Sequence, residues 1–394
     1  MADPKYRFGV RPDDFSEAAR GQLERSLSGA WTFIPAPLPP HLSWTPALIK
    51  ALSDADRALG QLDGHGSQLQ NPHLLIEPFA SREAVLSSQI EGTQASLSDL
   101  FSLEASQQEA QGDAREVQNY RRALDRGIDK LKRVPITLNL ICELHQILME
   151  GVRGQDPTPG RFRTTQNWIG SPGTTIESAA HVPPPPQRLA GCLDAFEKFV
   201  NQTSELPALV RMALMHYQFE AIHPFIDGNG RVGRLLITLA LCEWKLLSRP
   251  LLYLSAWFEQ TRSEYYARLS AVSRRGEWNE WLVYVLHGVA SQARDAVGRA
   301  TDLMALRDRM QERVRGTKSA ALLQLVDQLF RAPYISVPLA QRVLGQTQPG
   351  ARNNVIKLVK LGILREARMG KKPQIFVAPE ILKILEAVRS PVAG

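Results

Sequence analysis

Residues 223–234 read HPFIDGNGRVGR and stand between two apolar segments, 207–222 and 232–247. Both segments repeat apolar residues at helical spacing, and the second is apolar on most of its faces. The sequence therefore predicts two central helices joined by a short polar turn, with the second helix buried in the core.

The residue types of this turn suit the binding of a phosphate. Gly228 and Gly230 flank Asn229, so the backbone can adopt conformations that are closed to larger residues. The helix that follows begins with amide groups that have no partner inside the helix, and such an end attracts anions. Arg231 and Arg234 add two permanent positive charges that can each engage phosphate oxygens.

The same turn holds a candidate base and a candidate metal ligand. A histidine at position 223 can titrate near neutral pH and accept a proton from an attacking hydroxyl. Asp227 offers the hard oxygen that Mg²⁺ prefers, close to the expected phosphates. Because positioning and charge stabilisation supply most of the catalysis in phosphoryl-group chemistry, these residues predict an enzyme of that kind.

The twelve residues match every specified position of the Fic family signature, His-Pro-Phe-x-Asp/Glu-Gly-Asn-Gly-Arg-x-x-Arg, and the chain resembles that family. The resemblance implies an all-α fold: a Fic-type helical core with a short β-hairpin flap. It also implies transfer of AMP from ATP to a Ser, Thr or Tyr hydroxyl of a protein target, with Mg²⁺ as cofactor and release of pyrophosphate. His223 would be the general base and Asp227 the metal ligand. The residues expected to bind ATP are Gly228, Asn229, Gly230, Arg231, Val232, Gly233 and Arg234, with Arg234 at the γ-phosphate.

A possible inhibitory segment precedes this core. Residues 81–94, SREAVLSSQIEGTQ, read as a helix in which Ser87 and Glu91 share one face. Such a pair is usually solvated surface. Self-inhibited Fic proteins, however, carry Ser/Thr-x-x-x-Glu-Gly/Asn, which Ser87, Glu91 and Gly92 match. The resemblance therefore implies that Glu91 pairs with Arg234 and opposes the binding of the γ-phosphate.

The helical pattern is interrupted over residues 151–186, where Thr, Ile, Val and Trp surround Ser-Pro-Gly and four prolines follow. This composition predicts a short hairpin and then a polyproline segment. The resemblance makes the hairpin at 174–182 the flap that registers a target chain by strand addition. Val182 and Ile176 would then contact the adenine or the target, and Tyr266 would line the nucleotide pocket. An ordinary hairpin and a packed aromatic side chain stay open as alternatives.

The positive charge of the chain is concentrated at its C-terminal end. Residues 319–394 contain eleven Lys and Arg against four acidic residues, a surplus equal to the whole formal net charge of +7. A helix, a second helix capped by Ser336, a basic helix and two strand-like pieces follow one another, which predicts a winged helix-turn-helix domain. The residues expected to be exposed on the basic helix are Arg352, Asn353, Asn354 and Lys357. DNA is one partner that fits, whereas a protein-interaction module or a solvated basic surface fits equally.

Periodicity gives the remaining organisation. Further helices are expected at 45–62, 116–132, 138–150, 260–272, 278–299 and 301–314, with a linker at 314–318. We expect three consecutive domains: an N-terminal helical region with the inhibitory helix (1–115), the Fic core (116–313) and the winged helix (319–394).

Composition argues for a cytoplasmic location and against a membrane partner. No apolar run approaches the roughly 20 residues that span a bilayer, and the charged N-terminus lacks the apolar core of a secretory signal. Three widely spaced cysteines fit reduced thiols. His216 lies two helical turns from His223, too far to share a metal ion, so we interpret it, like Cys142 and His145, as structural.

Two other functions stay open. One is a Fic enzyme that transfers another phosphate-containing group or removes AMP from a modified target. The other is a DNA-binding regulator in which the Fic core senses a nucleotide. A homo-oligomer is compatible with either.

Overall fold

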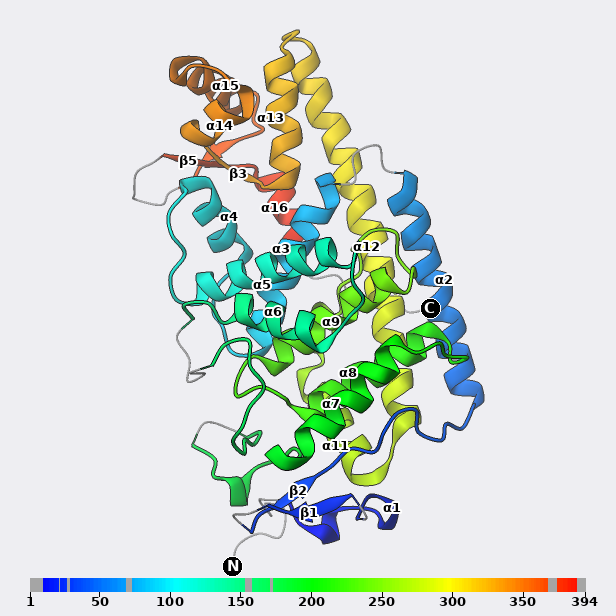
Figure 1. Cartoon of the computed structure of the whole chain (residues 1–394). Helices are drawn as coiled ribbons and strands as arrows, with labels where there is room; N and C mark the ends of the chain where they lie inside the picture. Colours follow the sequence, from blue (N-terminus) through cyan, green and yellow to red (C-terminus); the bar gives the residue numbers. More distant parts are fainter. Residues whose placement is uncertain are drawn as a thin grey trace, which may run out of the picture. The chain divides into compact units, whose positions relative to one another are not determined.

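The computed structural model describes residues 10–20, 22–26, 29–68, 73–152, 158–170, 173–367 and 374–387. Helices dominate these ranges, and two small antiparallel sheets accompany them (Figure 1), which confirms the expected all-α class. The helices are α1 (Glu17–Arg20), α2 (Pro46–Gln68), α3 (His73–Ile90), α4 (Leu97–Ser106), α5 (Asp113–Lys130), α6 (Leu138–Leu148), α7 (Pro186–Asn201), α8 (Ala208–Ile222), α9 (Asn229–Glu243), α10 (Ser255–Gln260), α11 (Arg262–Arg275), α12 (Trp278–Arg315), α13 (Ala320–Arg331), α14 (Val337–Leu344), α15 (Gln348–Lys360) and α16 (Pro379–Glu386). No helix within the described ranges is long and apolar enough to cross a bilayer.

The chain divides into two compact units that are each discontinuous in sequence. Unit 1 comprises Met1–Arg57, Arg122–Leu246 and Trp257–Ala290. Unit 2 comprises Ala58–Arg121, Leu247–Ala256 and Ser291–Gly394. The three consecutive domains expected from the sequence stay a prediction.

Unit 1 is built around α8 and α9, which pack side by side (Figure 1). Both helices are buried along nearly their whole length, as the apolar sequence of the second predicts. The neighbouring helices α6, α7 and α11 pack on this pair. The turn between α8 and α9 is therefore anchored at both ends in buried, close-packed helices.

The N-terminal part of unit 1 also contains a hairpin that the sequence did not suggest. Strands β1 (Leu23–Arg25) and β2 (Trp31–Phe33) pair antiparallel, with Leu23 opposite Phe33. Phe33 then contributes to a small buried cluster that includes Phe15. No strands were expected in this N-terminal helical region, because two three-residue strands give too short an alternation to be recognised in a sequence.

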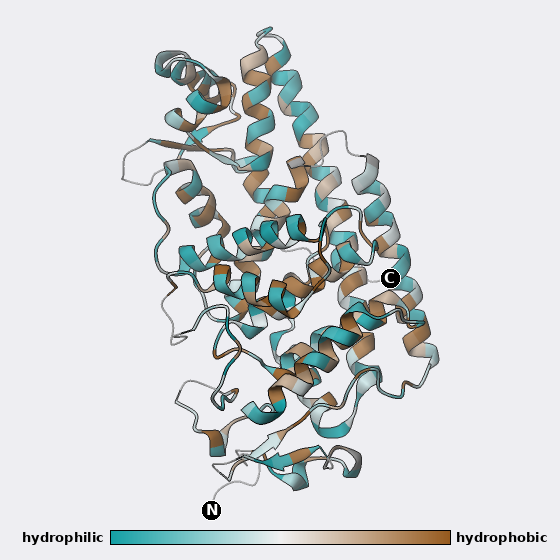
Figure 2. Ribbon diagram, in the orientation of Figure 1, coloured by the Kyte–Doolittle hydropathy of each residue, from teal (hydrophilic) through white to brown (hydrophobic). Residues whose placement is uncertain are grey.

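In unit 2, helix α13 packs against α3. The ribbon of α13 carries alternating hydrophobic and hydrophilic bands (Figure 2), and its apolar face, which includes Leu325 and Leu329, is fully buried. Helix α3 is held further by the buried carboxylate of Glu83, which accepts hydrogen bonds from the Tyr120 hydroxyl (3.1 Å) and the Ser255 amide (3.3 Å). Segments of unit 2 that precede residue 122 and follow residue 246 thus pack in one core.

The C-terminal part of unit 2 has the element order that the sequence predicts, with an additional strand, β3 (Tyr334–Ser336), and an additional helix, α16. The strand order is β3, β5 (Ile375–Val377) and β4 (Arg365–Glu366), all antiparallel. Ser336 caps α14 as expected, since its Oγ accepts the Leu339 amide at 3.3 Å. The connection over MGKK lies outside the described residues, and the assignment as a winged helix stays a prediction.

Two expectations about this half of the chain are wrong. Residues 278–314 form one continuous helix, α12, rather than two, and the hydroxyl of Thr301 bonds back to the Val297 carbonyl (3.0 Å) instead of starting a new helix. Asn354 is buried rather than exposed, because its amide donates to Gln346 Oε1 (2.9 Å) and holds the turn that precedes α15. Arg352, Asn353 and Lys357 are exposed as predicted.

Candidate active site

The turn after α8 is shaped by two residues with left-handed backbones. His223 caps the C-terminus of α8 with φ 48° and ψ 63°, and its amide still donates to the Phe219 carbonyl at 3.0 Å. Because a residue with a Cβ pays about 1–2 kcal/mol in this region, the surrounding contacts must hold it there. Gly228, with φ 77°, then starts α9. His223 as a whole is half-buried, and Nδ1 of its imidazole is buried.

Asn229 closes the turn on itself. Its side-chain oxygen accepts the Phe225 amide (2.8 Å), and its side-chain nitrogen donates to the Phe225 carbonyl (2.9 Å). The buried side chain thereby fixes the loop. The backbone of Asn229, at the N-terminus of α9, is the part placed to contribute to an anion site.

Charge is concentrated at the start of α9. The side chains of Arg231 and Arg234 are almost completely buried in its first two turns, where the amide ends of the helix also carry partial positive charge. The carboxylate of Asp227 is about half exposed: Oδ1 accepts the Gly228 amide at 2.6 Å and lies 3.7 Å from Arg231 Nη2. The described residues contain no group of three His, Cys, Asp or Glu side chains able to hold a metal. An exposed single carboxylate beside an anion site still fits Mg²⁺, which is usually held by one or two carboxylates together with phosphates and water.

His145 is the contributor to this site that sequence reasoning missed. Its Nε2 is 3.0 Å from the carbonyl of Asp227, and its Nδ1 accepts the amide of Gly160 at 2.9 Å. A carbonyl can only accept, so the ring must be the neutral tautomer with its proton on Nε2. The ring is completely buried. The only sequence signal was a histidine on the inner face of a helix, which is more often structural.

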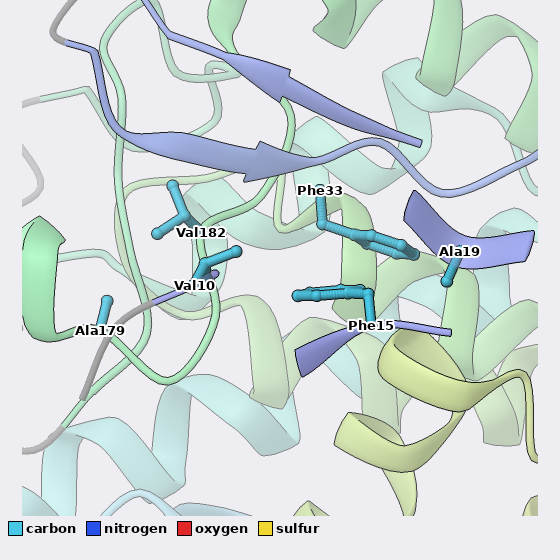
Figure 3. Close-up of a cluster of buried hydrophobic side chains, with 6 residues drawn as sticks. All are labelled: Val10, Phe15, Ala19, Phe33, Ala179 and Val182. Atoms are coloured by element: carbon cyan, nitrogen blue, oxygen red, sulfur yellow. The ribbon is translucent and has the colours of Figure 1, made fainter. Parts of the chain in front are cut away.

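The described part of the predicted flap has less strand pairing than a β-hairpin. In its described part, Ile169 and His181 form a single antiparallel bridge, and Ile176–Ser178 form a 3-10 turn. Val182 is fully buried beside Phe33, in a cluster that also contains Val10, Phe15, Ala19 and Ala179 (Figure 3). Ile176 packs against the same cluster. In this arrangement both side chains pack inside unit 1, and their contact with adenine or a target stays a prediction.

The aromatic pair on α11 has one buried and one exposed member. Tyr266 is 44% exposed, and its role in lining a nucleotide pocket stays a prediction. Tyr265 is buried, and its hydroxyl lies 2.9 Å from Nε2 of His216. The His216 ring stacks on Phe258, with centroids 5.5 Å apart. His216 is therefore a packed residue, as expected from its distance along α8.

Two stretches of the chain match family models. Residues 49–129 match the model described as "Fic/DOC family N-terminal", and residues 135–241 match the model described as "Fic/DOC family". In these two stretches the chain belongs to the Fic/DOC family. The Fic domain so defined contains the α8–α9 turn, His145 and the flap.

Relatives and a solved structure agree with this assignment. The Fic domain is similar to the "Protein adenylyltransferase Fic" of Drosophila grimshawi, at 40% identity over 114 residues, and to that of Drosophila melanogaster, at 37%. These matches cover 28% of this chain and 21% of each relative, so the chain spans about a fifth of the curated relatives' length. A crystal structure of a Fic family protein from Desulfovibrio desulfuricans G20 shares the fold, with a TM-score of 0.56 at 20% identity, over 86% of this chain and 98% of that one.

The candidate inhibitory motif lies in the Fic/DOC N-terminal match. Ser87 is fully buried in the last turn of α3, but the helix ends at Ile90, so Glu91 lies in the following turn and not on the helix face that the sequence predicts. Gly92, with φ 99°, provides the conformation that breaks the helix. The start of α5 holds this turn within unit 2, since Thr93 donates to Glu116 Oε2 (3.0 Å) and the Gln94 amide donates to Asp113 Oδ2 (2.7 Å).

Proposed function

We propose that this chain is a protein adenylyltransferase that moves AMP from ATP to a hydroxyl side chain of a protein target. The observation that carries the proposal is the α8–α9 turn: a half-buried histidine at the end of one helix stands next to the amide terminus of another, whose first two turns hold two buried arginines. The naming of the Drosophila relatives supports the same activity.

The residues of the turn have distinct roles in this reaction. His223 takes the proton of the attacking hydroxyl as its oxygen bonds to the α-phosphorus, and the bond to the β-phosphate oxygen breaks to release pyrophosphate. The first amides of α9, from Asn229 to Arg231, and the guanidinium of Arg234 bind phosphate oxygens. Asp227 would hold Mg²⁺, which would supply charge neutralisation at the phosphates.

We further propose that Glu91 restrains this activity by pairing with Arg234. Arg234 would then be unavailable to the γ-phosphate, and productive binding of ATP would require displacement of the carboxylate. The rigidity of the Thr93–Gln94 turn supports such a role, because a carboxylate carried on a fixed turn loses little conformational freedom when it pairs.

Labelled ATP tests both proposals. We expect wild-type protein to modify itself weakly and Glu91→Gly to do so at least about tenfold faster, which corresponds to about 1.4 kcal/mol. Glu109→Gly, which removes another exposed acid of unit 2, should behave as wild type. His223→Ala added to Glu91→Gly should abolish labelling. If Glu91→Gly protein incorporates no label, the transfer activity is refuted; if wild type and Glu91→Gly label equally, only the restraint is.

The mass of the adduct separates AMP transfer from the alternatives. Mass spectrometry of modified protein should show addition of an adenylyl group. A phosphate or a different nucleotide would instead indicate altered chemistry in the same fold, and loss of AMP from a premodified target would indicate the reverse reaction.

A second function, DNA binding by residues 319–387, is favoured by one specific observation. The exposed side of α15 presents Arg352, Asn353, Lys357 and Lys360, a basic face with one amide, while Asn354 fixes the turn before it. Electrophoretic mobility shifts at increasing salt test this, since phosphate contacts make the affinity fall steeply. Retention that is unchanged in Arg352→Ala/Lys357→Ala protein would rule this surface out.

A further inference from the structure

A buried arginine lies against the backbone of the catalytic turn. Arg163 is 3% exposed, and its side chain donates to four backbone carbonyls. Nε donates to His223 (2.9 Å), Nη1 to Thr165 (3.2 Å), and Nη2 to Pro184 (2.6 Å) and Ile222 (3.4 Å). These acceptors come from three separate stretches of unit 1.

Other donors in the segment 163–167 reinforce the contact between Arg163 and the turn. The amide of Arg163 donates to the Pro224 carbonyl at 2.9 Å. The side-chain amide of Asn167 donates to the carbonyls of His223 (3.3 Å) and Phe225 (2.8 Å). The segment 163–167 therefore satisfies four consecutive carbonyls, from Ile222 to Phe225. These are the carbonyls that the end of α8 and the left-handed turn leave without helical partners.

The guanidinium group suits this position better than other side chains would. Burial lowers the pKa of Arg163 to about 10, which reflects the cost of removing a cation from water. All the acceptors of its side chain are carbonyl dipoles rather than a carboxylate, and a positive group is favourable at the C-terminal end of α8. A planar fork can donate in several directions at once, which neither lysine nor glutamine can reproduce.

The same side chain connects the turn to the flap. Pro184 lies in the polyproline segment that leaves the flap, and His181 before it lies with Nε2 3.1 Å from the carbonyl of Ala221 at the end of α8. Arg163 therefore donates hydrogen bonds both to His223 and to the segment that leaves the flap. If that segment moved, Arg163 would lose an acceptor, and its bond to His223 would change.

We propose that Arg163 is a positioning residue that holds the backbone of His223 in the orientation needed for proton transfer and links it to the flap. Arg163 acts through the carbonyl of His223 and contacts no reacting group. This inference rests on the proposed adenylyl transfer, because it assigns the orientation of the base in that reaction.

The test compares Arg163→Gln, Arg163→Lys and Arg161→Gln in the full-length Glu91→Gly chain. Arg161 is an exposed arginine two residues away and serves as the matched control. We expect Arg163→Gln to lower kcat about 100-fold with the KM for ATP within about threefold, because a misdirected base slows chemistry without weakening nucleotide binding. Arg163→Lys should recover part of the loss, and Arg161→Gln should match the parent chain.

A second readout does not depend on turnover. The Cε1–Hε1 signal of the His223 imidazole, assigned by its absence in His223→Ala, should shift or broaden in Arg163→Gln and stay in place in Arg161→Gln. An unshifted signal together with kcat within about threefold of the parent would overturn the proposal. If Arg163→Gln does not fold, kcat and the His223 signal of Arg163→Lys test the proposal instead. If the parent chain transfers no AMP, the proposed function fails, while the imidazole signal still decides whether Arg163 orients His223.

Discussion

The ring of His145 stacks face to face on Phe225, with centroids 3.7 Å apart and planes within 4°. The contact joins α6 to the middle of the α8–α9 turn. Because the same ring also bonds to the carbonyl of Asp227, one side chain holds both the apolar and the charged part of the turn. His145, which lies outside the signature, thus helps to fix the conformation of the turn.

Removal of His145 should loosen the metal ligand. His145→Ala loses two hydrogen bonds and a stacked ring, so we expect the free energy of unfolding to fall by about 2–4 kcal/mol. Because the Asp227 carbonyl loses its donor and its carboxylate is then less well positioned, the protein should bind Mg²⁺-ATP about tenfold more weakly, as measured by calorimetry in the Glu91→Gly background. Gln146→Ala, at an exposed neighbouring position, is the control. An unchanged affinity in a destabilised His145→Ala protein would restrict His145 to a packing role.

Gly228 should tolerate no side chain. Its backbone has φ 77°, and an added Cβ would lie 3.0 Å from Met149 Sδ and 3.4 Å from Nε2 of His145. We expect Gly228→Ala to lower the free energy of unfolding by about 1–2 kcal/mol in urea titrations. The control is Gly191→Ala in α7, where an added Cβ meets nothing within 4 Å. That variant should be neutral or stabilised by up to about 1 kcal/mol, and a similar cost at both positions would contradict the argument.

Acid should destabilise unit 1 through His216. Burial, helped by the charge of Arg234, lowers its pKa from 6.5 to about 3. The unfolded state therefore binds the proton first, so this stability is complete above about pH 6.5 and is lost as the pH falls below it. The loss reaches at most about 1.4 kcal/mol per pH unit for one imidazole.

Urea unfolding between about pH 6.5 and about pH 5 measures this effect. His216→Gln should lower the slope of stability against pH, whereas His287→Gln, at an exposed position of α12, should leave it unchanged. Equal slopes in wild type and His216→Gln would show that other groups govern acid unfolding.

The buried carboxylate of Glu83 should stabilise α3 through Tyr120. The Tyr120 hydroxyl donates to Glu83 Oε1 at 3.1 Å inside unit 2. In a double-mutant cycle with Glu83→Gln and Tyr120→Phe we expect a coupling free energy of about 1 kcal/mol. Additive effects would mean that the hydrogen bond contributes nothing. Since α3 leads into the Glu91 turn, either variant should also raise automodification above wild type if that turn restrains the enzyme.

The sequence was informative wherever the evidence was local. The signature puts His223, Asp227 and the arginines within twelve consecutive residues, so their proximity needed no knowledge of the fold. Helical periodicity located α8 and α9 because both are long and apolar. It failed at α12, which is one helix where two were expected. The hairpin of the flap was expected from composition, and the described residues of that segment contain one bridge.

By itself, the sequence determined the family, the helical class and the residues of the α8–α9 turn, because each follows from neighbours along the chain. Only the tertiary structure decided which distant side chains hold that turn. His145 and Asp227 are 82 residues apart, and Arg163 and His223 are 60 apart. A buried histidine or arginine has no periodic signature, and its acceptors are backbone carbonyls that every residue possesses, so only folding selects among them.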